Sequence, residues 1–315
     1  SGWVRFEGVN VSKGDTIKVK LLSEYPSDRC EYICAADGKV TTNPKFTWFV
    51  FREAVISGIG ELDPSQIVAQ AVNTNVKPNA TFSCSNDLFC RIEKIWRQSQ
   101  LDNMHAGVAT DCPHRERLPY TGDGQITMPM VLANFDVAAF YNKWIGDVKA
   151  SQNPETGYVP NGSPWEPCCG GGPAWGAAIC VMPWEFYNRY GDRELLESCL
   201  QPMKDFVAYY DTWTIEDGTT AFHMTTPSGA QFYWYNLGDW SPAYQLPKDE
   251  LVHTFFHWYC ADITSKVCKV LGDEDGAASY SAKADRIRDA FNNVYYDPQT
   301  KSYGDFGSNV YALYM

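Results

Sequence analysis

The sequence predicts a mainly α-helical protein whose helical part is preceded by a small β-rich segment. The first observation is that residues 1 to about 82 contain short runs of alternating or of aromatic and β-branched residues between turn signals, a pattern typical of strands. The second is that apolar residues recur at helical spacing from about residue 83 onward. Because no strand pattern interrupts these long helices, they are expected to pack in pairs. A chain of 315 residues with 44% hydrophobic residues suffices for one large or two ordinary domains.

Residues 1–82 are expected to be most of a β-sandwich whose beginning is missing. Strands are expected where apolar residues alternate or where aromatic and β-branched residues gather, at residues 16–21, 46–56 and 67–72. Turns are expected at Asp37-Gly38 and Asp63-Pro64, since these pairs favour tight turns. Packing against the helical domain is favoured over a separate binding role for this segment.

The rest of the chain, residues 83–315, is expected to form a helical domain that is incomplete at its C-terminal end. Its first helix has an apolar face and has Ser85 or Asn86 as N-cap candidates. Later helices are expected at residues 137–148, 174–190, 194–213, 256–270 and 280–291, and from about residue 309. Gly191 and Gly272 are placed to end helices, because glycine readily adopts the left-handed conformation found after a helix.

The helical part is organised around Thr110–Gln125, which reads TDCPHRERLPYTGDGQ. Its two prolines and its glycines at 122 and 124 disfavour regular structure, so an irregular loop is expected. The charged residues of the stretch are Asp111, Arg115, Glu116, Arg117 and Asp123. Because several carboxyls in one pocket cannot all ionise at low cost, one is expected to keep its proton near neutral pH. Such a proton suits acid catalysis at a glycosidic oxygen, and the alternative is an ion-pair network that only pins the loop.

This stretch resembles the signature of the bacterial α-L-rhamnosidases, glycoside hydrolase family 78. In that family it runs roughly D-C-P-x-R-x-E-R or D-C-P-x-R-E-R, followed by L-G-W-x-G-D. The resemblance implies that Glu116 is the general acid and that Asp111 and Asp123 bind rhamnose hydroxyls. It also implies that residues 83–315 form an (α/α)6 barrel catalytic domain, present here only in part.

Two departures from the family pattern leave the accepted sugar open. Pro119 stands where the family usually has glycine, and Tyr120 stands where it usually has tryptophan. Tyr120 keeps an aromatic wall and adds a hydroxyl, so it is counted with Arg115 among the expected substrate-binding residues.

Two later segments also resemble the family. The PAWG segment carries Trp175, and the resemblance implies that this ring stacks on the sugar, the alternative being a core tryptophan. The LGDW segment carries Asp239, which is expected to accept a sugar hydroxyl, and Trp240, which is expected to wall the subsite. The alternative for this pair is a turn or N-cap aspartate beside a packed tryptophan.

The resemblance further implies cleavage with inversion of configuration, which requires a second carboxylate as general base. In the family that base lies far beyond the acid along the chain, so it is expected beyond residue 315. The expected partner is a rhamnose-containing oligosaccharide, polysaccharide or glycoside. Another exo-glycosidase on the same scaffold and a non-catalytic carbohydrate-binding relative remain the alternatives.

Composition excludes several other functions. A net charge of −12 makes nucleic acid a poor partner, because a phosphate backbone would be repelled. No apolar run approaches the ~20 residues that a membrane span needs. The chain opens SGWVRFEG, which looks cut from something longer, so a periplasmic and a cytoplasmic location both stay open.

No metal or cofactor is expected. The 11 cysteines include no paired CxxC motifs, so mostly reduced and buried thiols are predicted. His253 and His257 have a spacing that could bind a metal, but a packed or surface pair is expected because no third ligand is evident. The glycine-rich segment 157–172 lacks the pattern of a phosphate loop.

Overall fold

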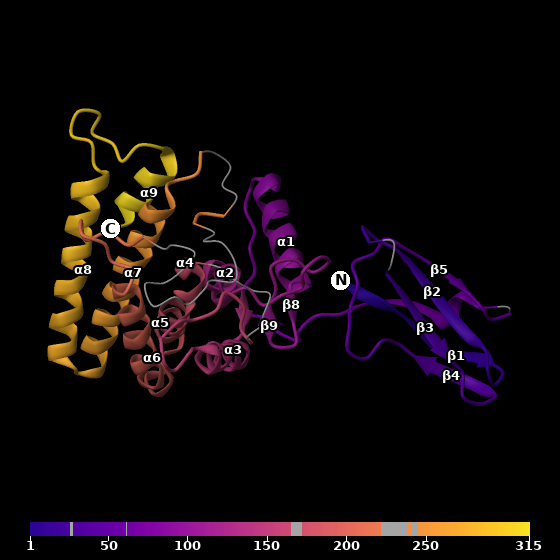
Figure 1. Cartoon of the computed structure of the whole chain (residues 1–315). Coiled ribbons are helices and arrows are strands. Elements are labelled where there is room, and N and C mark those ends of the chain that lie inside the picture. Colours follow the sequence, from indigo (N-terminus) through magenta and orange to yellow (C-terminus); the bar gives the residue numbers. More distant parts are fainter. Residues whose placement is uncertain (26–27, 61, 165–171, 222–237, 241–244) are drawn as a thin grey trace. The chain divides into compact units, whose positions relative to one another are not determined.

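The computed structural model describes residues 1–25, 28–60, 62–164, 172–221, 238–240 and 245–315 (Figure 1). The chain groups into two compact units. The first consists of Ser1–Asn75 with Phe82–Arg117, and the second of Val76–Thr81 with Leu118–Met315. The domain boundary expected after residue 82 remains a prediction.

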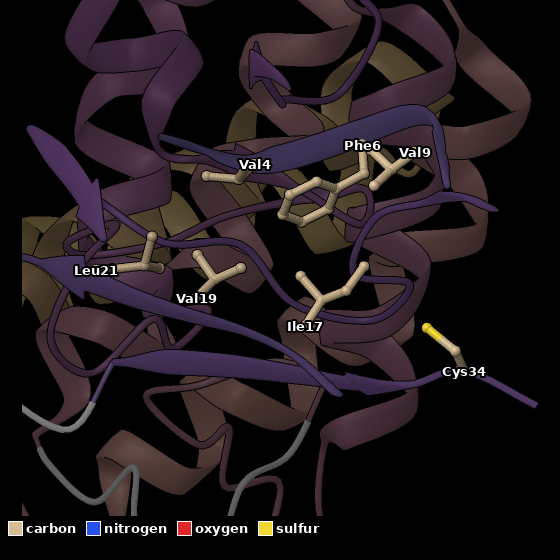
Figure 2. Packing of buried hydrophobic residues seen from close by; sticks show 7 residues of the cluster. All are labelled: Val4, Phe6, Val9, Ile17, Val19, Leu21 and Cys34. Atoms are coloured by element: carbon tan, nitrogen blue, oxygen red, sulfur yellow. The ribbon is translucent and has the colours of Figure 1, made fainter. Parts of the chain in front are cut away.

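The first unit contains a β-sandwich of two three-stranded antiparallel sheets, ordered β4-β1-β6 and β3-β2-β5. Their strands are β1 (Gly2–Val11), β2 (Thr16–Leu22), β3 (Arg29–Ile33), β4 (Gly38–Thr42), β5 (Glu53–Ser57) and β6 (Ile67–Ala71). Alternate residues of β2 point inward, so that Ile17, Val19 and Leu21 are buried against Phe6 of β1 (Figure 2). The predicted sandwich is therefore confirmed, with one buried core between its sheets.

One strand prediction was wrong over most of its length. Residues 46–56 were expected to form a strand, but only Glu53–Ser57 does so, and Phe49 makes a single bridge to Gly2. The side chain of Phe46 is fully exposed, whereas the indole of Trp48 stacks on His105 with ring centroids 3.9 Å apart. Of the aromatic residues that suggested a strand, Trp48 therefore packs against His105 outside any strand.

The first unit also contains helix α1 (Asp87–Asp102), followed by the short strands β8 (Met104–His105) and β9 (Val108–Ala109). Asn86 is its N-cap, as one of the two predicted candidates, and its side chain accepts a hydrogen bond of 2.9 Å from the Leu88 amide.

The second unit is built mainly of helices. They are α2 (Thr121–Asn134), α3 (Ala138–Ser151), α4 (Pro173–Gly176), α5 (Ala178–Tyr190), α6 (Arg193–Asp211), α7 (Asp249–Leu271), α8 (Glu274–Tyr295) and α9 (Phe306–Tyr314). The strand pair β7 (Lys77–Pro78) and β10 (Phe135–Asp136) completes the described elements of this unit. The helix expected over residues 174–190 is interrupted at Ala177, which separates α4 from α5. Within the described part of the chain, no helix is both long and apolar enough to cross a membrane.

Two helix pairs turn in the same way. Gly191 ends α5 and Gly272 ends α7, each in the left-handed conformation, with φ of 69° and 85°. In each case the next residue is an aspartate, Asp192 or Asp273, whose carboxylate caps the following helix. Residues next to each turn thus bond to unpaired backbone groups at the helix ends. Helix α5 packs on α6, and α7 packs on α8 (Figure 1). The predicted paired-helix architecture is confirmed.

Helix α2 was not predicted, since Thr110–Gln125 was expected to be irregular throughout. The structure begins the helix at Thr121 and places both glycines inside its first turns. A Cβ atom at Gly122 would lie 2.5 Å from Nε1 of Trp175, and one at Gly124 would lie 2.1 Å from Cη2 of Trp144. These glycines therefore allow two tryptophan rings to approach the helix backbone, and they do not mark a break in regular structure.

Candidate active site

The carboxyl-rich loop ends the first unit and brings together three of the predicted site residues. The thiol of Cys112 donates to Glu116 Oε2 at 2.8 Å and to Asp111 Oδ2 at 3.1 Å. Arg115 Nε donates to the same Glu116 Oε2 at 2.6 Å. Glu116 is therefore held by a cation and a neutral thiol, and that thiol also reaches the second carboxylate. Sequence reasoning counted Cys112 only among mostly reduced thiols and missed this role.

The protonation state of Glu116 differs from the expectation. Burial acts to raise its pKa, but hydrogen bonds with Arg115, Cys112 and Asp111 outweigh that effect and lower the pKa to about 2. Burial and the hydrogen bonds to Glu116 and Asp111 raise the pKa of the Cys112 thiol to about 11, so the thiol keeps its proton and donates it. The pKa of Glu116 is therefore shifted downward in this structure, the opposite of the direction expected for a carboxyl that holds its proton.

The loop is pinned by a tryptophan from the β-rich part of the same unit. Trp48 Nε1 donates to the carbonyl oxygen of Pro113 at 3.1 Å, and Arg117 Nη1 donates to the carbonyl oxygen of Trp48 at 2.9 Å. Arg117 itself has a φ of 55°, a left-handed conformation that non-glycine residues rarely adopt. Arg117 thus holds the loop in place through a backbone carbonyl, whereas Arg115 forms an ion pair with the candidate acid.

In the second unit, the start of α2 is bonded to the segment that carries Trp175. Thr121 Oγ1 donates to the carbonyl oxygens of Asn161 at 2.9 Å and Trp175 at 2.8 Å. Tyr120, the N-cap residue of α2, pairs with Gly162 in an isolated antiparallel bridge. Together with the contact at Gly122, these bonds fix the half-buried Trp175 against the first turn of α2.

Asp123 lies in that first turn and is half-buried. A carboxylate there is stabilised by the unpaired amide groups at the helix N-terminus. The structure therefore groups Tyr120, Asp123 and Trp175 on adjoining segments of one unit, as a sugar subsite with an aromatic wall would require.

Asp239 and Trp240 lie among other elements of the second unit. Burial raises the pKa of Asp239, and so does the charge of Asp305, the N-cap of α9, whereas a hydrogen bond with Tyr311 lowers it. The Trp240 side chain is 66% exposed, which leaves its ring accessible. Most of the surrounding loop, and residues 165–171 of the glycine-rich segment, fall outside the described residues.

Sequence reasoning missed a carboxyl with a raised pKa on α5. Burial raises the pKa of Glu185, which is half-buried. It lines a cavity of about 550 Å³ that is bounded by α5, α7 and α8 and includes Trp184, Trp258 and Tyr259. A tryptophan beside a glutamate in a helix is also common in ordinary packing, so the sequence carried no distinct signal for this position.

Two clusters contain residue types that could bind a metal ion. The donor atoms of Asp111, Cys112 and Glu116 lie within 4.8 Å of one another, but the protonated thiol and the adjacent Arg115 both disfavour a cation. His253 and His257 are buried on α7, and His257 Nδ1 lies 2.9 Å from Thr220 Oγ1. Both histidines are therefore packed in the interior, which is one of the two arrangements expected for this pair.

Comparisons with known proteins agree on one family. Residues 77–315 match the model described as the bacterial alpha-L-rhamnosidase six-hairpin glycosidase domain, which is more than half of the chain. An alpha-L-rhamnosidase of Formosa agariphila is 27% identical over an alignment of 285 residues that covers 84% of this chain and 28% of that protein. One from Streptomyces avermitilis is 28% identical and matches 90% of this chain and 26% of its own length.

Solved structures of alpha-L-rhamnosidases have a similar fold. An alpha-L-rhamnosidase from Dictyoglumus thermophilum superposes with a TM-score of 0.80 at 28% identity, covering 94% of this chain and 34% of that chain. The Streptomyces avermitilis enzyme, solved in complex with L-rhamnose, has a TM-score of 0.78 at 23% identity, covering 94% of this chain and 29% of its own. The chain spans between 26% and 32% of the length of the four curated relatives that it matches.

Proposed function

Because the chain belongs to the bacterial alpha-L-rhamnosidase six-hairpin glycosidase family, we propose that it forms part of a glycoside hydrolase that releases terminal α-L-rhamnose with inversion. The observation that carries this proposal is the arrangement of Asp111, Arg115 and Glu116 around Cys112 in one loop. The proposed substrate is a rhamnose-containing oligosaccharide, polysaccharide or glycoside. The roles proposed for individual residues are given for each unit separately.

We assign residues for sugar recognition in each unit by itself. Asp111 and Arg115 in the first unit, and Asp123 in the second, supply charged groups for sugar hydroxyls. Trp175 and Tyr120 offer aromatic faces for the apolar side of a 6-deoxy sugar. Asp239 and Trp240 would serve a further subsite through one carboxyl and one exposed ring.

Glu116 is the proposed proton donor, and it must gain its proton when the sugar binds. Burial is already the largest influence on its pKa, and a bound sugar would bury the carboxyl further. The Arg115 side chain is 62% exposed and can move aside at little cost. The carboxyl would then protonate and deliver the proton to the leaving oxygen as the glycosidic bond breaks.

Inversion needs a second carboxylate, roughly 6.5–9.5 Å from the acid, that activates water on the opposite face of the sugar. We propose that this base is supplied from outside residues 1–315, in keeping with the fraction of the relatives that this chain spans. Residues 1–315 alone should then show little turnover of an aryl α-L-rhamnoside. Robust hydrolysis that disappears with Glu116→Gln would contradict the placement of the base and would put it within this chain.

A second exo-glycosidase activity on the same scaffold is kept because of one specific difference. Pro119 and Tyr120 occupy the positions of the usual glycine and tryptophan, and the carbonyl oxygen of Pro119 accepts a hydrogen bond of 3.1 Å from the Ser163 amide. This bond restrains the backbone at the position where the residues differ from the family pattern. A panel of nitrophenyl glycosides, assayed with the full gene product, separates rhamnose from other terminal sugars. Calorimetry with L-rhamnose separates either enzyme from a protein that does not bind the sugar.

A further inference from the structure

Two cysteines at the start of α1 lie in contact. The Sγ atoms of Cys84 and Cys90 are 3.7 Å apart, so rotation of the side chains can bring them to bonding distance. Cys84 is exposed and Cys90 is half-buried, so solvent reaches the pair. The sulfur atoms also lie near backbone oxygens, with Cys84 Sγ 3.3 Å from the carbonyl of Asn86 and Cys90 Sγ 3.6 Å from the carbonyl of Cys84.

The other described cysteines are less suited to oxidation. Cys30 and Cys112 are half-buried, and burial, the largest influence on both, raises the pKa of each thiol, so each holds little of the nucleophilic thiolate at neutral pH. The remaining described thiols are buried, at Cys34, Cys180, Cys199, Cys260 and Cys268. Access and proximity therefore coincide at Cys84 and Cys90 alone among the residues that the structure describes.

We propose that Cys84 and Cys90 are a modification site that forms an intramolecular disulfide with a low-molecular-weight disulfide such as oxidised glutathione. The exposed Cys84 thiolate attacks one sulfur of the small disulfide and releases one small thiol. The Cys90 thiolate then attacks the Cys84 sulfur of the mixed disulfide and releases the second. Two protein thiols thus lose two electrons and two protons, and the small disulfide is reduced to two thiols.

The bond would close a short loop around the N-cap of α1. That loop contains Asn86, whose carbonyl accepts hydrogen bonds of 3.1 Å from the Phe89 amide and 3.3 Å from the Cys90 amide. A covalent link between the preceding segment and the first turn restrains fraying of this helix end. The inference is independent of the proposed hydrolase activity, because disulfide formation is measured by peptide mass and hydrogen exchange and not by hydrolysis.

The test is peptide mass spectrometry of the native chain after treatment with oxidised glutathione. Trypsin should release residues 53–91 as one peptide, because the Lys77-Pro78 bond resists cleavage, and Cys84 and Cys90 are its only cysteines. We expect this peptide to become lighter by two hydrogen atoms and to outnumber its glutathione adduct by at least about tenfold. Hydrogen exchange at the Phe89 and Cys90 amides should slow by about tenfold in the oxidised protein.

Two variants control the experiment. Cys84→Ser should abolish the mass loss and leave a glutathione adduct at Cys90, whereas Cys30→Ser should leave the mass loss unchanged, with circular dichroism reporting the fold of each. A peptide that stays reduced while other cysteines are modified would overturn the proposal. A stable glutathione adduct at Cys84 without ring closure, or a disulfide that forms only after unfolding, would overturn it as well.

Discussion

Replacing Arg115 with methionine should raise the pKa of the Glu116 carboxyl, because it removes a cation that stabilises the ionised form. Burial is the largest influence on this carboxyl and raises its pKa, and the hydrogen bond from Arg115 is the largest influence that opposes it. The donor and acceptor atoms are 2.6 Å apart, within the range of a charge-assisted hydrogen bond.

The size of the change follows from the donors that share the effect. The usual pKa of 4.5 falls to about 2, a difference of 4.5 − 2 = 2.5 pH units, and Arg115, Cys112 and Asp111 all contribute to it. A contacting cation lowers a carboxyl pKa by about 1 to 3 pH units, and solvent around the 62% exposed guanidinium favours the lower value. The variant should therefore titrate about one pH unit higher, near pH 3.

The assay is a ¹³C NMR titration of the glutamate side-chain carboxyls, with Glu116→Gln to assign the resonance. Arg286→Met is the matched control, since Arg286 is exposed on α8 and far along the chain from the loop. The Arg115→Met substitution should also make the free energy of unfolding less sensitive to acid. A carboxyl with a depressed folded pKa stabilises the protein above its unfolded pKa, and that contribution is lost as the pH falls from 4.5 toward the folded value. An unchanged Glu116 pKa in the Arg115 variant would refute this account of the site.

Three further predictions concern packing, charge and capping. Gly122→Ala should lower the free energy of unfolding by about 1–3 kcal/mol in urea titrations, because its Cβ would overlap the Trp175 ring, whereas Gly146→Ala on α3, with open space around its Cβ, should be neutral or stabilising. Burial lowers the folded pKa of His253 to about 3, so the unfolded chain alone binds a proton below pH 6.5 and stability should fall as the pH drops from 6.5 toward 3, by up to about 1.4 kcal/mol per pH unit. His253→Leu should flatten that slope, and a slope equal to that of the unmodified chain would contradict the assignment. Asp192→Ala should cost about 1 kcal/mol in thermal unfolding, because the α6 amide at Leu195 loses its cap, and no loss would mean that water replaces it.

The parts of the fold that follow local rules could be predicted from the sequence. The alternation in Thr16–Leu22, the cap at Asn86, and the glycines at 191 and 272 each depend on residues close together in the chain. For that reason the sequence predicts both the sandwich and the paired helices.

The parts that depend on distant contacts could not be predicted. Gly122 and Gly124 look like loop residues until the rings of Trp175 and Trp144 are known to lie against them. Trp48 resembles a strand residue until its bond to Pro113 is seen. The partner of Trp48 is set by tertiary structure, which local secondary-structure propensity does not encode.

The direction of the pKa shift of the candidate acid, Glu116, also depends on contacts that the sequence does not show. The sequence shows several carboxyls close together, and like charges alone would favour a held proton. It does not show that Arg115 and Cys112 both direct their hydrogen atoms at Glu116 Oε2. The net effect of the cluster is set by this geometry, which reverses the direction of the pKa shift expected from composition.

The role of position 116 as proton donor is tested most directly by comparing leaving groups in the full gene product. A general acid matters most when the leaving oxygen is basic, so Glu116→Gln should reduce kcat/KM on phenyl α-L-rhamnoside by about 10²–10⁴-fold. The loss on the 2,4-dinitrophenyl glycoside should be much smaller, since that leaving group departs without a proton. Equal losses on both substrates, or no loss on either, would contradict the assignment of this carboxyl as the acid.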